Sequence, residues 1–500
     1  MTVQIETGPV APPLASSPDG APLSLPLCVD MDGSLLRIDT LHEAALAAAC
    51  AGPRALLRLL GALRDGKAAV KAAAAETWSF DPATLPYSAA LLALIETERA
   101  AGRRIVLCTA AHRRIAERIA AHLGLFDEVI ATEGGENLRG PRKAARLVER
   151  FGRGGFLYAG NDATDLAVWA ESGGAVVVNA PGAVLSRARA LAPVSAVLRD
   201  AAPGAGARAA LRALRPHQWL KNALCLVPPL AAGDLGLAAW AGALTVMVAF
   251  CLTASAIYVV NDLSDLAADR AHPRKSRRPF ASGALSAKTG MLMAPALLLG
   301  GLLLGWLAGA LPILIAYAVL SVAYSLALKE QPLVDVFALA ALYTIRLFGG
   351  GEASGHPVSL WLLSFSAFIF LSLALIKRVA ELDRLQKAKE RRASRRGYAV
   401  EDAPILQSFG SAATFASAVV LLLYIQSDTA SRTYAAPAAL WGAVPLLLFW
   451  QCRLWISTAR GYMHDDPIVY ASRDWVSWAV LACLGAVVAL AWAGLPGWPA

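Results

Sequence analysis

Residues 261–269 read Asn-Asp-Leu-Ser-Asp-Leu-Ala-Ala-Asp and follow a long apolar run. The carboxylates of Asp262, Asp265 and Asp269 are three and four residues apart, so a helix would carry all of them on one face. Like charges on one face destabilise a bare helix, and divalent cations would neutralise them. Magnesium prefers carboxylate and phosphate oxygens and often bridges the two. This Asp-rich segment (residues 261–269) therefore predicts a magnesium and diphosphate site at the end of a membrane span, although a solvated acidic helix end would show the same spacing.

The chain of 500 residues has two parts of different composition. Residues 1–210 mix charged and apolar residues as soluble α/β proteins do, and from residue 217 long apolar runs alternate with short charged loops. Apolar runs of about 20 residues are membrane-span candidates. The sequence predicts an N-terminal α/β domain and a C-terminal all-α membrane domain of about nine transmembrane helices. These spans would centre near residues 227, 249, 297, 318, 342, 367, 416, 445 and 485.

Loop charge predicts the orientation of the membrane domain. The loops at 261–283, 328–332, 377–404 and 458–475 are basic, whereas those at 308–310, 349–357 and 427–434 are nearly neutral. Basic loops favour the cytoplasmic side, so we expect a multi-pass protein of the cytoplasmic membrane with its N-terminal domain in the cytoplasm. The net charge of +9 is concentrated beside a span, with nine basic and three acidic residues from Lys377 to Arg396. This placement favours anionic lipids and phosphorylated substrates over nucleic acid.

The N-terminal end lacks a basic region followed by an apolar core, so we expect no signal peptide. Residues 1–24 are rich in Pro, Ala and Ser and are expected to form a disordered tail. The seven cysteines show no pairing pattern and are expected to be reduced, as in cytosolic proteins. The predicted domains are 25–205, with a helical cap at about 38–98, a linker at 206–216, and the membrane domain at 217–500.

Three predicted strands of the N-terminal domain end in polar groups. In chain order these groups are Asp30 and Asp32 after the strand at 25–29, Thr109 after 105–108, then Lys143, and Asn161, Asp162 and Asp165 after 156–159. Two carboxylates two residues apart at a strand end can hold magnesium and present a nucleophile. Each motif alone is weak, but their order along the chain predicts a phosphoryl-binding site.

This order of motifs resembles the haloacid dehalogenase-like phosphatases, and the cap resembles that of phosphoserine-phosphatase-like members. The resemblance implies that Asp30 forms an aspartyl-phosphate and that Asp32 is the general acid/base. It also implies that Thr109 and Lys143 bind the phosphoryl group, and that Asp165 binds magnesium together with Asp30 and Asp32.

The fourth motif departs from the family pattern. It usually opens Gly-Asp, but Gly160-Asn161 stands here and Asp162 is displaced by one position. Asn is a neutral ligand, so metal affinity would fall. A fold retained with weak or no activity therefore stays open.

A run of cations follows the Asp-rich segment, in Arg270-x-His272-Pro273-Arg274-Lys275-x-Arg277-Arg278-Pro279. Such cations can bind phosphate oxygens directly, although Lys275 and Arg277 could be mere positive-inside residues. From about residue 212 to 497 the chain resembles the UbiA superfamily of intramembrane prenyltransferases, which implies a nine-helix fold around a central cavity. The finer resemblance is to its decaprenyl-phosphate phosphoribosyltransferase subgroup, which shares His-Pro-x-Lys-x-x-Arg-Pro. Further matching positions are Arg215, Pro216, Gln218, Trp219, Lys221, Asn222, Tyr324, Ser325, Leu328, Lys329, Val334, Asp335, Ile345 and Arg346.

The second motif also fits that subgroup. Where UbiA enzymes with aromatic substrates carry a second Asp-rich motif, this chain has Lys377-Arg378-x-x-Glu381-Leu382-Asp383. The resemblance therefore implies a magnesium-dependent transferase that moves 5-phosphoribose from phosphoribosyl diphosphate to a polyprenyl phosphate. Its catalytic metal ligands would be Asp262, Asp265 and Asp269. Its substrate-binding residues would be Lys221, Asn222, Asn261, His272, Lys275, Arg277, Arg278, Lys329, Arg346, Lys377, Arg378 and Glu381.

Several alternatives remain open on the sequence. His272 would contact phosphate or support the loop. The N-terminal domain would remove the 5-phosphate of the product, or act as a regulatory or scaffold domain. The whole chain could instead be a prenyltransferase that uses prenyl diphosphate and a small acceptor, or a non-enzymatic transporter or lipid-binding scaffold.

Overall fold

The computed structural model describes residues 4–7, 25–133, 137–200, 205–387, 397–463 and 466–494. They form two compact units, one of Met1–Ala213 with Val259–Met293 and one of Leu214–Tyr258 with Ala294–Ala500. The Asp-rich segment therefore groups with the N-terminal domain, although its sequence predicts that it belongs to the membrane domain. Helices α11 (Leu237–Ser264) and α13 (Ala287–Leu307) contribute residues to both units.

The first unit contains a seven-stranded sheet in the order β1-β7-β6-β5-β2-β3-β4, and all its pairs are parallel except β1 with β7. Its strands are β1 (Gln4–Thr7), β2 (Leu27–Val29), β3 (Ile105–His112), β4 (Glu128–Thr132), β5 (Leu157–Gly160), β6 (Gly174–Val178) and β7 (Val194–Arg199). The predicted α/β domain is confirmed. The predicted disorder is wrong at Gln4–Thr7, which pair with the edge of β7 and satisfy its backbone groups; residues 1–3 and 8–24 lie outside the described residues.

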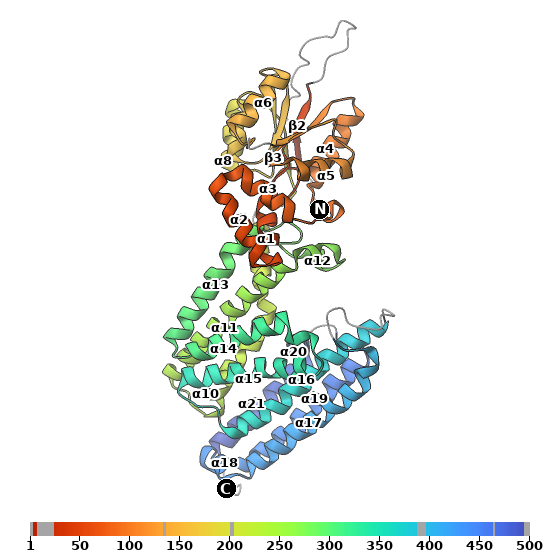
Figure 1. The fold of residues 1–500 in the computed structure, drawn as a ribbon. Coiled ribbons are helices and arrows are strands. Elements are labelled where there is room, and N and C mark those ends of the chain that lie inside the picture. The colour runs from red at the N-terminus through yellow and green to blue at the C-terminus, as the bar shows by residue number, and fades with distance from the viewer. Residues whose placement is uncertain are drawn as a thin grey trace. The chain divides into compact units, whose positions relative to one another are not determined.

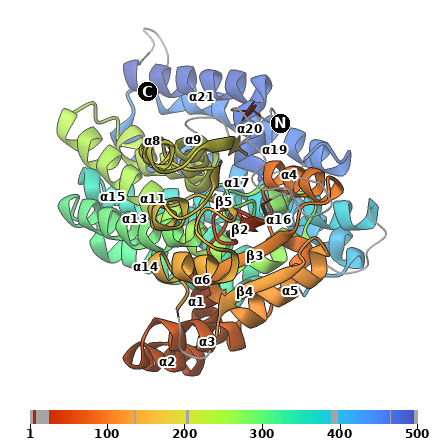
Figure 2. The ribbon, with the colours of Figure 1, turned by 90° about the horizontal axis from the view of Figure 1, so that it is seen from above.

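Helices cover both faces of this sheet because its central strands are apolar on both sides. Figures 1 and 2 show α4 and α5 on one side of β2 and β3, and α6 and α8 on the other. Three helices, α1 to α3, fill the segment of the predicted cap. The helices of this unit are α1 (Thr40–Ala51), α2 (Pro53–Gly61), η1 (Ala62–Asp65), α3 (Lys67–Thr77), η2 (Pro82–Thr84), α4 (Ala89–Ala100), α5 (Arg113–Leu123), α6 (Pro141–Phe151), η3 (Ala163–Asp165), α7 (Leu166–Trp169), α8 (Gly182–Leu191), α9 (Ala205–Leu214), α12 (Leu266–Ala271) and η5 (Lys275–Arg277).

The second unit is all-helical. Besides its parts of α11 and α13, it contains η4 (Pro216–Leu226), α10 (Val227–Ala231), α14 (Leu311–Leu326), η6 (Leu328–Glu330), α15 (Val334–Ser354), α16 (Leu360–Lys387), η7 (Val400–Asp402), α17 (Ala403–Ile425), α18 (Asp428–Thr433), η8 (Pro437–Gly442), α19 (Ala443–Ala459), α20 (Pro467–Arg473) and α21 (Trp475–Ala493). Figure 1 shows α16 and α17 side by side along this unit.

The predicted count of nine spans is not confirmed among the described residues, where seven helices are long and apolar enough to cross a membrane. The predicted span near residue 318 is α14, which is apolar but shorter. Near residue 227 the chain forms η4 and the short α10 instead of one long helix. Pro228 and Pro229 lack backbone N–H groups, which explains why a regular helix does not run through this segment.

Small residues allow the helices of the second unit to approach closely, as is common between membrane helices. Gly350 of α15 lies against η4, and a Cβ added to it would overlap the backbone carbonyl of Cys225. Gly410 of α17 lies against α19, where a Cβ would overlap the Trp455 ring. The contact at Gly350 fixes η4, which carries two of the predicted substrate-binding residues.

We predict that Gly350→Ala lowers the thermal unfolding midpoint of the purified protein, because overpacking against a backbone group costs about 1–3 kcal/mol. The matched control is Gly485→Ala in α21, where an added Cβ would meet no atom within 4 Å. A helix gains about 0.8–1 kcal/mol from Ala over Gly, so the control keeps or raises the midpoint. Equal shifts in the two variants would contradict close packing at Gly350.

Candidate functional site

The Asp-rich segment keeps helical hydrogen bonding through the junction of α11 and α12. The Asp265 N–H donates to the Asn261 carbonyl at 2.9 Å, and the Asp269 N–H donates to the Asp265 carbonyl at 2.8 Å. Asp262 and Asp269 are both buried, and Arg278 joins them: its Nη1 lies 2.9 Å from Asp262 Oδ1 and 2.6 Å from Asp269 Oδ2. Two of the three predicted carboxylates therefore meet at one cation.

These two carboxylates fit a divalent cation. Asp269 Oδ1 is buried without a hydrogen-bond partner, and Lys275 Nζ lies 3.9 Å from it. Arg278 stands between the carboxylates, where it supplies the positive charge that a metal ion would otherwise supply. The described residues contain no group of three or more His, Cys, Asp or Glu side chains that could hold a metal, so the predicted three-carboxylate set is not gathered in this conformation.

The residues after the Asp-rich segment have different roles. His272 Nδ1 accepts hydrogen bonds from the N–H groups of Arg274 and Lys275 at 3.1 and 3.3 Å, which supports its structural alternative. Arg274, Lys275 and Arg277 are exposed. Arg270 is nearly buried and binds both carboxylate oxygens of Glu43 in α1, at 2.7 and 2.5 Å. Arg270 is therefore committed to an ion pair within the first unit.

A second cluster lies in the second unit around Asp466, at the start of α20. Lys221 Nζ of η4 lies 2.8 Å from Asp466 Oδ2, and Lys377 Nζ of α16 lies 3.4 Å from the same atom. The Tyr343 hydroxyl donates to this carboxylate at 3.2 Å, and the Ile468 N–H donates to it at 3.2 Å. We call Lys221, Lys377 and Asp466 the lysine cluster; it brings together two predicted substrate-binding residues from distant parts of the chain.

Asn222 and Arg346 are joined in the same unit. Arg346 Nε donates to Asn222 Oδ1 at 2.7 Å, and Arg346 Nη2 donates to the Tyr317 hydroxyl at 3.3 Å. The guanidinium also lies 4.9 Å from the centre of the Tyr317 ring. Since Lys221 and Asn222 are neighbours in η4, both pairs of contacts depend on the position of that short helix.

Arg378 and Glu381 lie apart from the lysine cluster. The Arg378 guanidinium is wholly buried and forms ion pairs with Asp335 of α15 and Glu381 of α16. The Tyr398 hydroxyl donates to Asp335 at 2.5 Å and accepts from the Leu333 N–H at 2.7 Å. In this geometry Arg378 joins α15 and α16, and its predicted substrate contact stays a prediction.

The N-terminal site gathers residues from β2, α6 and β5, with Asp30 and Lys143 both nearly buried. Lys143 Nζ lies 2.6 Å from Asp30 Oδ1 and donates to the Tyr158 hydroxyl at 2.8 Å. That hydroxyl donates to Asp165 Oδ1 at 2.9 Å. Burial raises the pKa of Asp30 to about 7, and the nearby Asp165 carboxylate raises it further, whereas Lys143 lowers it. Lys143 is shared between these two carboxylates. A further cation would relieve this excess of carboxylate charge, and carboxylates are ligands that magnesium prefers. In this conformation the described residues Asp30, Asp32 and Asp165 do not gather into a three-ligand group.

The other predicted residues of this site have local partners. Asp32 Oδ1 accepts from the Thr40 N–H at 2.8 Å, and burial raises the pKa of Asp32 to about 6. Thr109 is buried in β3, and its hydroxyl oxygen accepts from the Ala111 N–H. Asp165 Oδ2 accepts from the Asn161 and Asp162 N–H groups at 2.9 and 3.0 Å, so both of its oxygens already have donors.

Asn161 stands where the family motif has Asp. Its side chain packs directly on Gly33, next to the loop of Asp30 and Asp32, and accepts from the Ser34 hydroxyl at 3.3 Å. The displaced Asp162 instead begins η3 and accepts from the Ala163 N–H. The neutral amide therefore occupies the position beside the nucleophile loop.

Several residues that contact the predicted site were not found from the sequence. They are Tyr158, Lys71, Glu43, Tyr317, Tyr343 and Asp466. Lys71 reaches from α3 to the carbonyl of Ala110, next to Thr109, and to Asn137 Oδ1. A signal existed for Asp466, which lies in a basic loop and precedes Pro467, as residues at helix starts often do.

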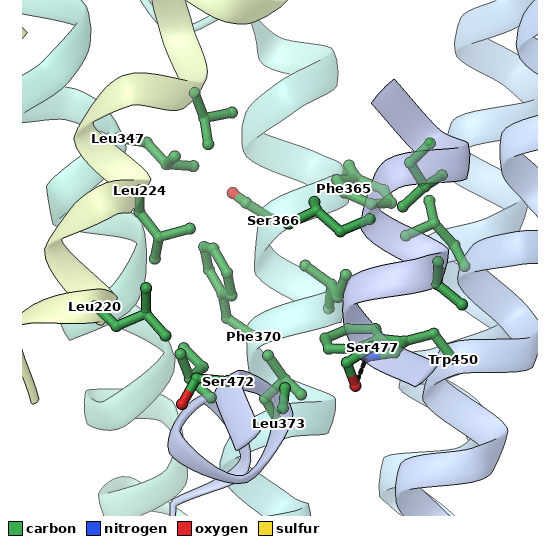
Figure 3. Close-up of a pocket in the computed structure, with 18 of the residues that line it drawn as sticks. Leu220, Leu224, Leu347, Phe365, Ser366, Phe370, Leu373, Trp450, Ser472 and Ser477 are labelled. Carbon is green, nitrogen blue, oxygen red and sulfur yellow. Dashed lines mark hydrogen bonds between the residues drawn. The ribbon is translucent and has the colours of Figure 1, made fainter. Parts of the chain in front are cut away.

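An apolar cavity of about 380 Å³ adjoins the lysine cluster. Figure 3 shows Leu220 and Leu224 on one side of it, with Phe370 and Trp450 among its other walls. Its wall includes the hydroxyls of Ser366, Ser472 and Ser477, which donate to Leu363 O, Val469 O and Asp474 Oδ2 at 2.8–2.9 Å. Because these hydroxyls are already engaged, the wall suits a hydrocarbon chain.

We predict that Asp466→Asn lowers the thermal unfolding midpoint, because it leaves the nearly buried Lys221 ammonium without its anion, at a cost of about 3–5 kcal/mol. Asp383→Asn is the control, since its ion pair with Lys387 is largely exposed and worth about 0.3–0.5 kcal/mol. Equal shifts would contradict a stabilising role of the lysine cluster.

The ion pairs of Asp466 with Lys221 and Lys377 also predict that the stability of the fold depends on pH. Burial alone would raise the pKa of Asp466, but Lys221 and Lys377 outweigh it and hold that pKa well below its ordinary value. A lowered folded-state pKa stabilises the fold above the unfolded value of about 3.9, and this stabilisation is lost as the pH falls below it. Wild type should therefore lose more stability than Asp466→Asn between about pH 5 and pH 3.

The chain is similar to known proteins along both of its parts. The UbiA prenyltransferase family model matches residues 223–465, and the haloacid dehalogenase-like hydrolase model matches residues 27–168. The uncharacterized protein y4nM of Sinorhizobium fredii is 37% identical over 474 residues, which cover 93% of this chain and 91% of that protein.

More distant similarity extends to an enzyme and to a solved structure. The decaprenyl-phosphate phosphoribosyltransferase of Mycolicibacterium smegmatis is 40% identical over 179 residues, which are 34% of this chain and 56% of that enzyme. The structure of a UbiA homolog from Archaeoglobus fulgidus bound to GPP and Mg2+ matches with 16% identity and a TM-score of 0.43, over 56% of this chain and 99% of that one. With its apolar helices and both family matches, the chain is an integral membrane enzyme of the UbiA prenyltransferase family that carries a haloacid dehalogenase-like domain.

Proposed function

We propose that this enzyme transfers 5-phosphoribose from phosphoribosyl diphosphate to a polyprenyl phosphate. The observation that carries the proposal is that the chain segments of the lysine cluster also supply walls of the apolar cavity. Leu220 lines the cavity and directly precedes Lys221, and Ile468 lines the cavity and follows closely after Asp466 in the sequence. A lipid with an anionic head and a hydrocarbon tail fits two such adjoining surfaces, because cations bind phosphate and apolar walls bind the chain.

The donor would bind at the Asp-rich segment. Asp262, Asp265 and Asp269 would hold magnesium, which when bound neutralises the diphosphate leaving group. Arg278 and Lys275 are already beside these carboxylates and would contact phosphate oxygens of the donor. The phosphoribosyl donor is supported by the 40% identity to an enzyme described as a decaprenyl-phosphate phosphoribosyltransferase.

The proposed phosphoribosyl transfer depends on binding and orienting the two substrates more than on proton transfer. The lipid phosphate is an anionic nucleophile, so it can attack the anomeric carbon without a general base. The structure is consistent with this, because His272 uses Nδ1 to accept backbone hydrogen bonds. Lys221, Lys377 and Arg346 would hold the lipid phosphate and the 5-phosphate, and Lys329, in η6, stays a candidate.

The N-terminal domain would then remove the 5-phosphate from the product on the cytoplasmic side, with α1 to α3 as its cap. Asp30 would be the nucleophile, Asp32 the acid/base, and Lys143 and Thr109 would bind the phosphoryl group. Tethering two sites in one chain raises their effective concentration to the order of millimolar. The orientation rests on the basic loops, which favour the cytoplasmic side.

The second candidate is transfer of a prenyl group from prenyl diphosphate to a small acceptor. The apolar cavity would accept that lipid equally well, and the matching family model is that of the UbiA prenyltransferases. The lysine cluster favours the first candidate, since a neutral aromatic acceptor gains nothing from the two ammonium groups that face Asp466.

The transfer is tested with membranes that contain the enzyme, radiolabelled phosphoribosyl diphosphate and polyprenyl phosphate. We expect a labelled lipid that depends on magnesium, and a loss of about 100- to 1,000-fold in Asp262→Asn and Asp269→Asn, because charge stabilisation at the leaving group is removed. Asp428→Asn, an exposed carboxylate in α18, is the control and should retain activity. No labelled lipid, with turnover of prenyl diphosphate instead, would reject the first candidate.

The second step is tested with Asp30→Asn. This variant should release no phosphate from the product while it still labels the lipid, so that the 5-phosphorylated lipid accumulates; chromatography of the labelled lipid separates the two forms. Asp81→Asn, an exposed carboxylate of the same domain, should behave as wild type. If Asp30→Asn removes both activities at equal folded yield, the two steps are not separable.

A further inference from the structure

A polar pocket of about 320 Å³ begins beside the nucleophile loop of the first unit. Its wall includes Gly33, Arg37, Asn161, Asn179, Arg199 and Asp200. Gly33 and Asn161 follow β2 and β5, Asn179 follows β6, and Arg199 ends β7. The pocket therefore runs along the carboxyl edge of the parallel sheet, where ligands bind in open α/β folds.

The pocket is long enough to hold a second group away from the reacting phosphate. The strand order places β7 three positions from β2. At about 4.8 Å between neighbouring strands, this spans roughly 14 Å. The Gly33 and Asn161 end adjoins Asp30 and Asp32, whereas the Arg199 end lies far along the edge. A substrate whose phosphomonoester reaches Asp30 would extend toward Arg199.

The charge of the pocket favours a substrate whose second group, away from the reacting phosphate, is an anion. Arg37 and Arg199 both line it, and two guanidinium groups in one pocket repel each other unless an anion lies between them. The lining contains one acid, Asp200, which accepts from Asn179 Nδ2 at 2.6 Å and from the Ala90 N–H at 3.3 Å. Its one negative charge balances only one of the two arginines, so the lining keeps a net positive charge. Guanidinium groups suit phosphate because they present paired donors to its oxygens.

We propose that Arg37 and Arg199 form a subsite for a second phosphate, so that the N-terminal domain selects phosphomonoesters that also carry a phosphodiester at their far end. This inference rests on the proposed phosphatase function of the domain. It specifies the substrate class: a sugar phosphorylated at both ends, with the terminal monoester at Asp30 and the diester at the two arginines.

The segment after the Asp-rich segment also contributes to the wall of this pocket. Gly283, from the chain that follows the Asp-rich segment, lines the same pocket, and its φ of +68° is unfavourable for other residues. A Cβ at Gly283 would lie 2.9 Å from Arg37 Cβ, so this backbone packs directly on the arginine. The Arg270–Glu43 ion pair holds the same stretch of chain within the first unit. A group-transfer reaction that attaches a phosphosugar to a phosphate would supply the required diester.

The test uses the full-length protein in detergent with magnesium and two synthetic probes. One is ribose 5-phosphate; the other is ribose 5-phosphate with a short-chain alkyl phosphodiester on its anomeric carbon. We expect wild type to prefer the second probe in kcat/KM, measured as phosphate release. Arg37→Gln and Arg199→Gln should each reduce this preference about tenfold, as the loss of one charge-assisted contact does.

Two matched variants separate the subsite from general effects. Arg146→Gln removes an exposed arginine of α6 and should leave the preference unchanged. Arg37→Lys keeps the charge and should restore part of the preference that Arg37→Gln loses, which a merely misfolded pocket would not show. Equal kcat/KM for the two probes in wild type, or a preference that ignores both arginines, would overturn the proposal.

If the domain releases no phosphate from either probe, the same comparison is made as equilibrium binding by calorimetry. The subsite then predicts a lower Kd for the two-phosphate probe, again reduced about tenfold in each arginine variant. Equal Kd values would overturn it. Since both probes are synthetic, failure of lipid labelling would reject the transferase proposal and leave this measurement intact.

Discussion

The cost of burying a charge without a partner governs the polar parts of this protein. A single buried ion left unpaired destabilises a protein by several kcal/mol, so each buried charge must meet its opposite where the chain folds. Arg278 joins Asp262 and Asp269, Lys221 meets Asp466, and Arg378 meets Asp335. The Lys221–Asp466 pair links η4 to the start of α20, and the Arg378–Asp335 pair links α16 to α15, so the positions of these helices depend on the two pairs.

Such pairing also explains how these sites can bind ligands. In the lysine cluster two ammonium groups share one carboxylate, and at the Asp-rich segment two carboxylates share one guanidinium. The lysine cluster therefore has an excess of positive charge, which a phosphate would balance. At the Asp-rich segment Lys275 also lies 3.9 Å from Asp269, so a divalent cation would bind the carboxylates in place of these side-chain cations.

Much of the fold could be predicted from sequence because it depends on local patterns. Apolar runs gave the long helices, and strand-end motifs located β2, β3 and β5. Two features could not be predicted. The apolar character of the chain near residue 227 hides that Pro228 and Pro229 remove backbone donors. The pairing of Gln4–Thr7 with β7 depends on an edge about 190 residues away in sequence.

The candidate site could be predicted only in part. Lys221 and Lys377 belong to sequence motifs that predict substrate binding, but no local pattern shows that both lysines meet Asp466. The same limit applies to Arg378, whose motif suggests phosphate although its burial against Asp335 decides its role.

The Asp-rich segment groups with the N-terminal domain, and contacts within this unit show how the segment is held. Arg270 sits within a run of cations that the sequence associates with phosphate, yet its guanidinium is fully used by Glu43 of α1. A residue that only bound substrate would gain nothing from this bidentate pair, whereas a residue that fixes the segment against α1 requires it. Gly283 adds to the same contact, since any side chain there would displace Arg37. Mutations in α1 would therefore alter the segment that holds the proposed donor site, because both belong to the first unit.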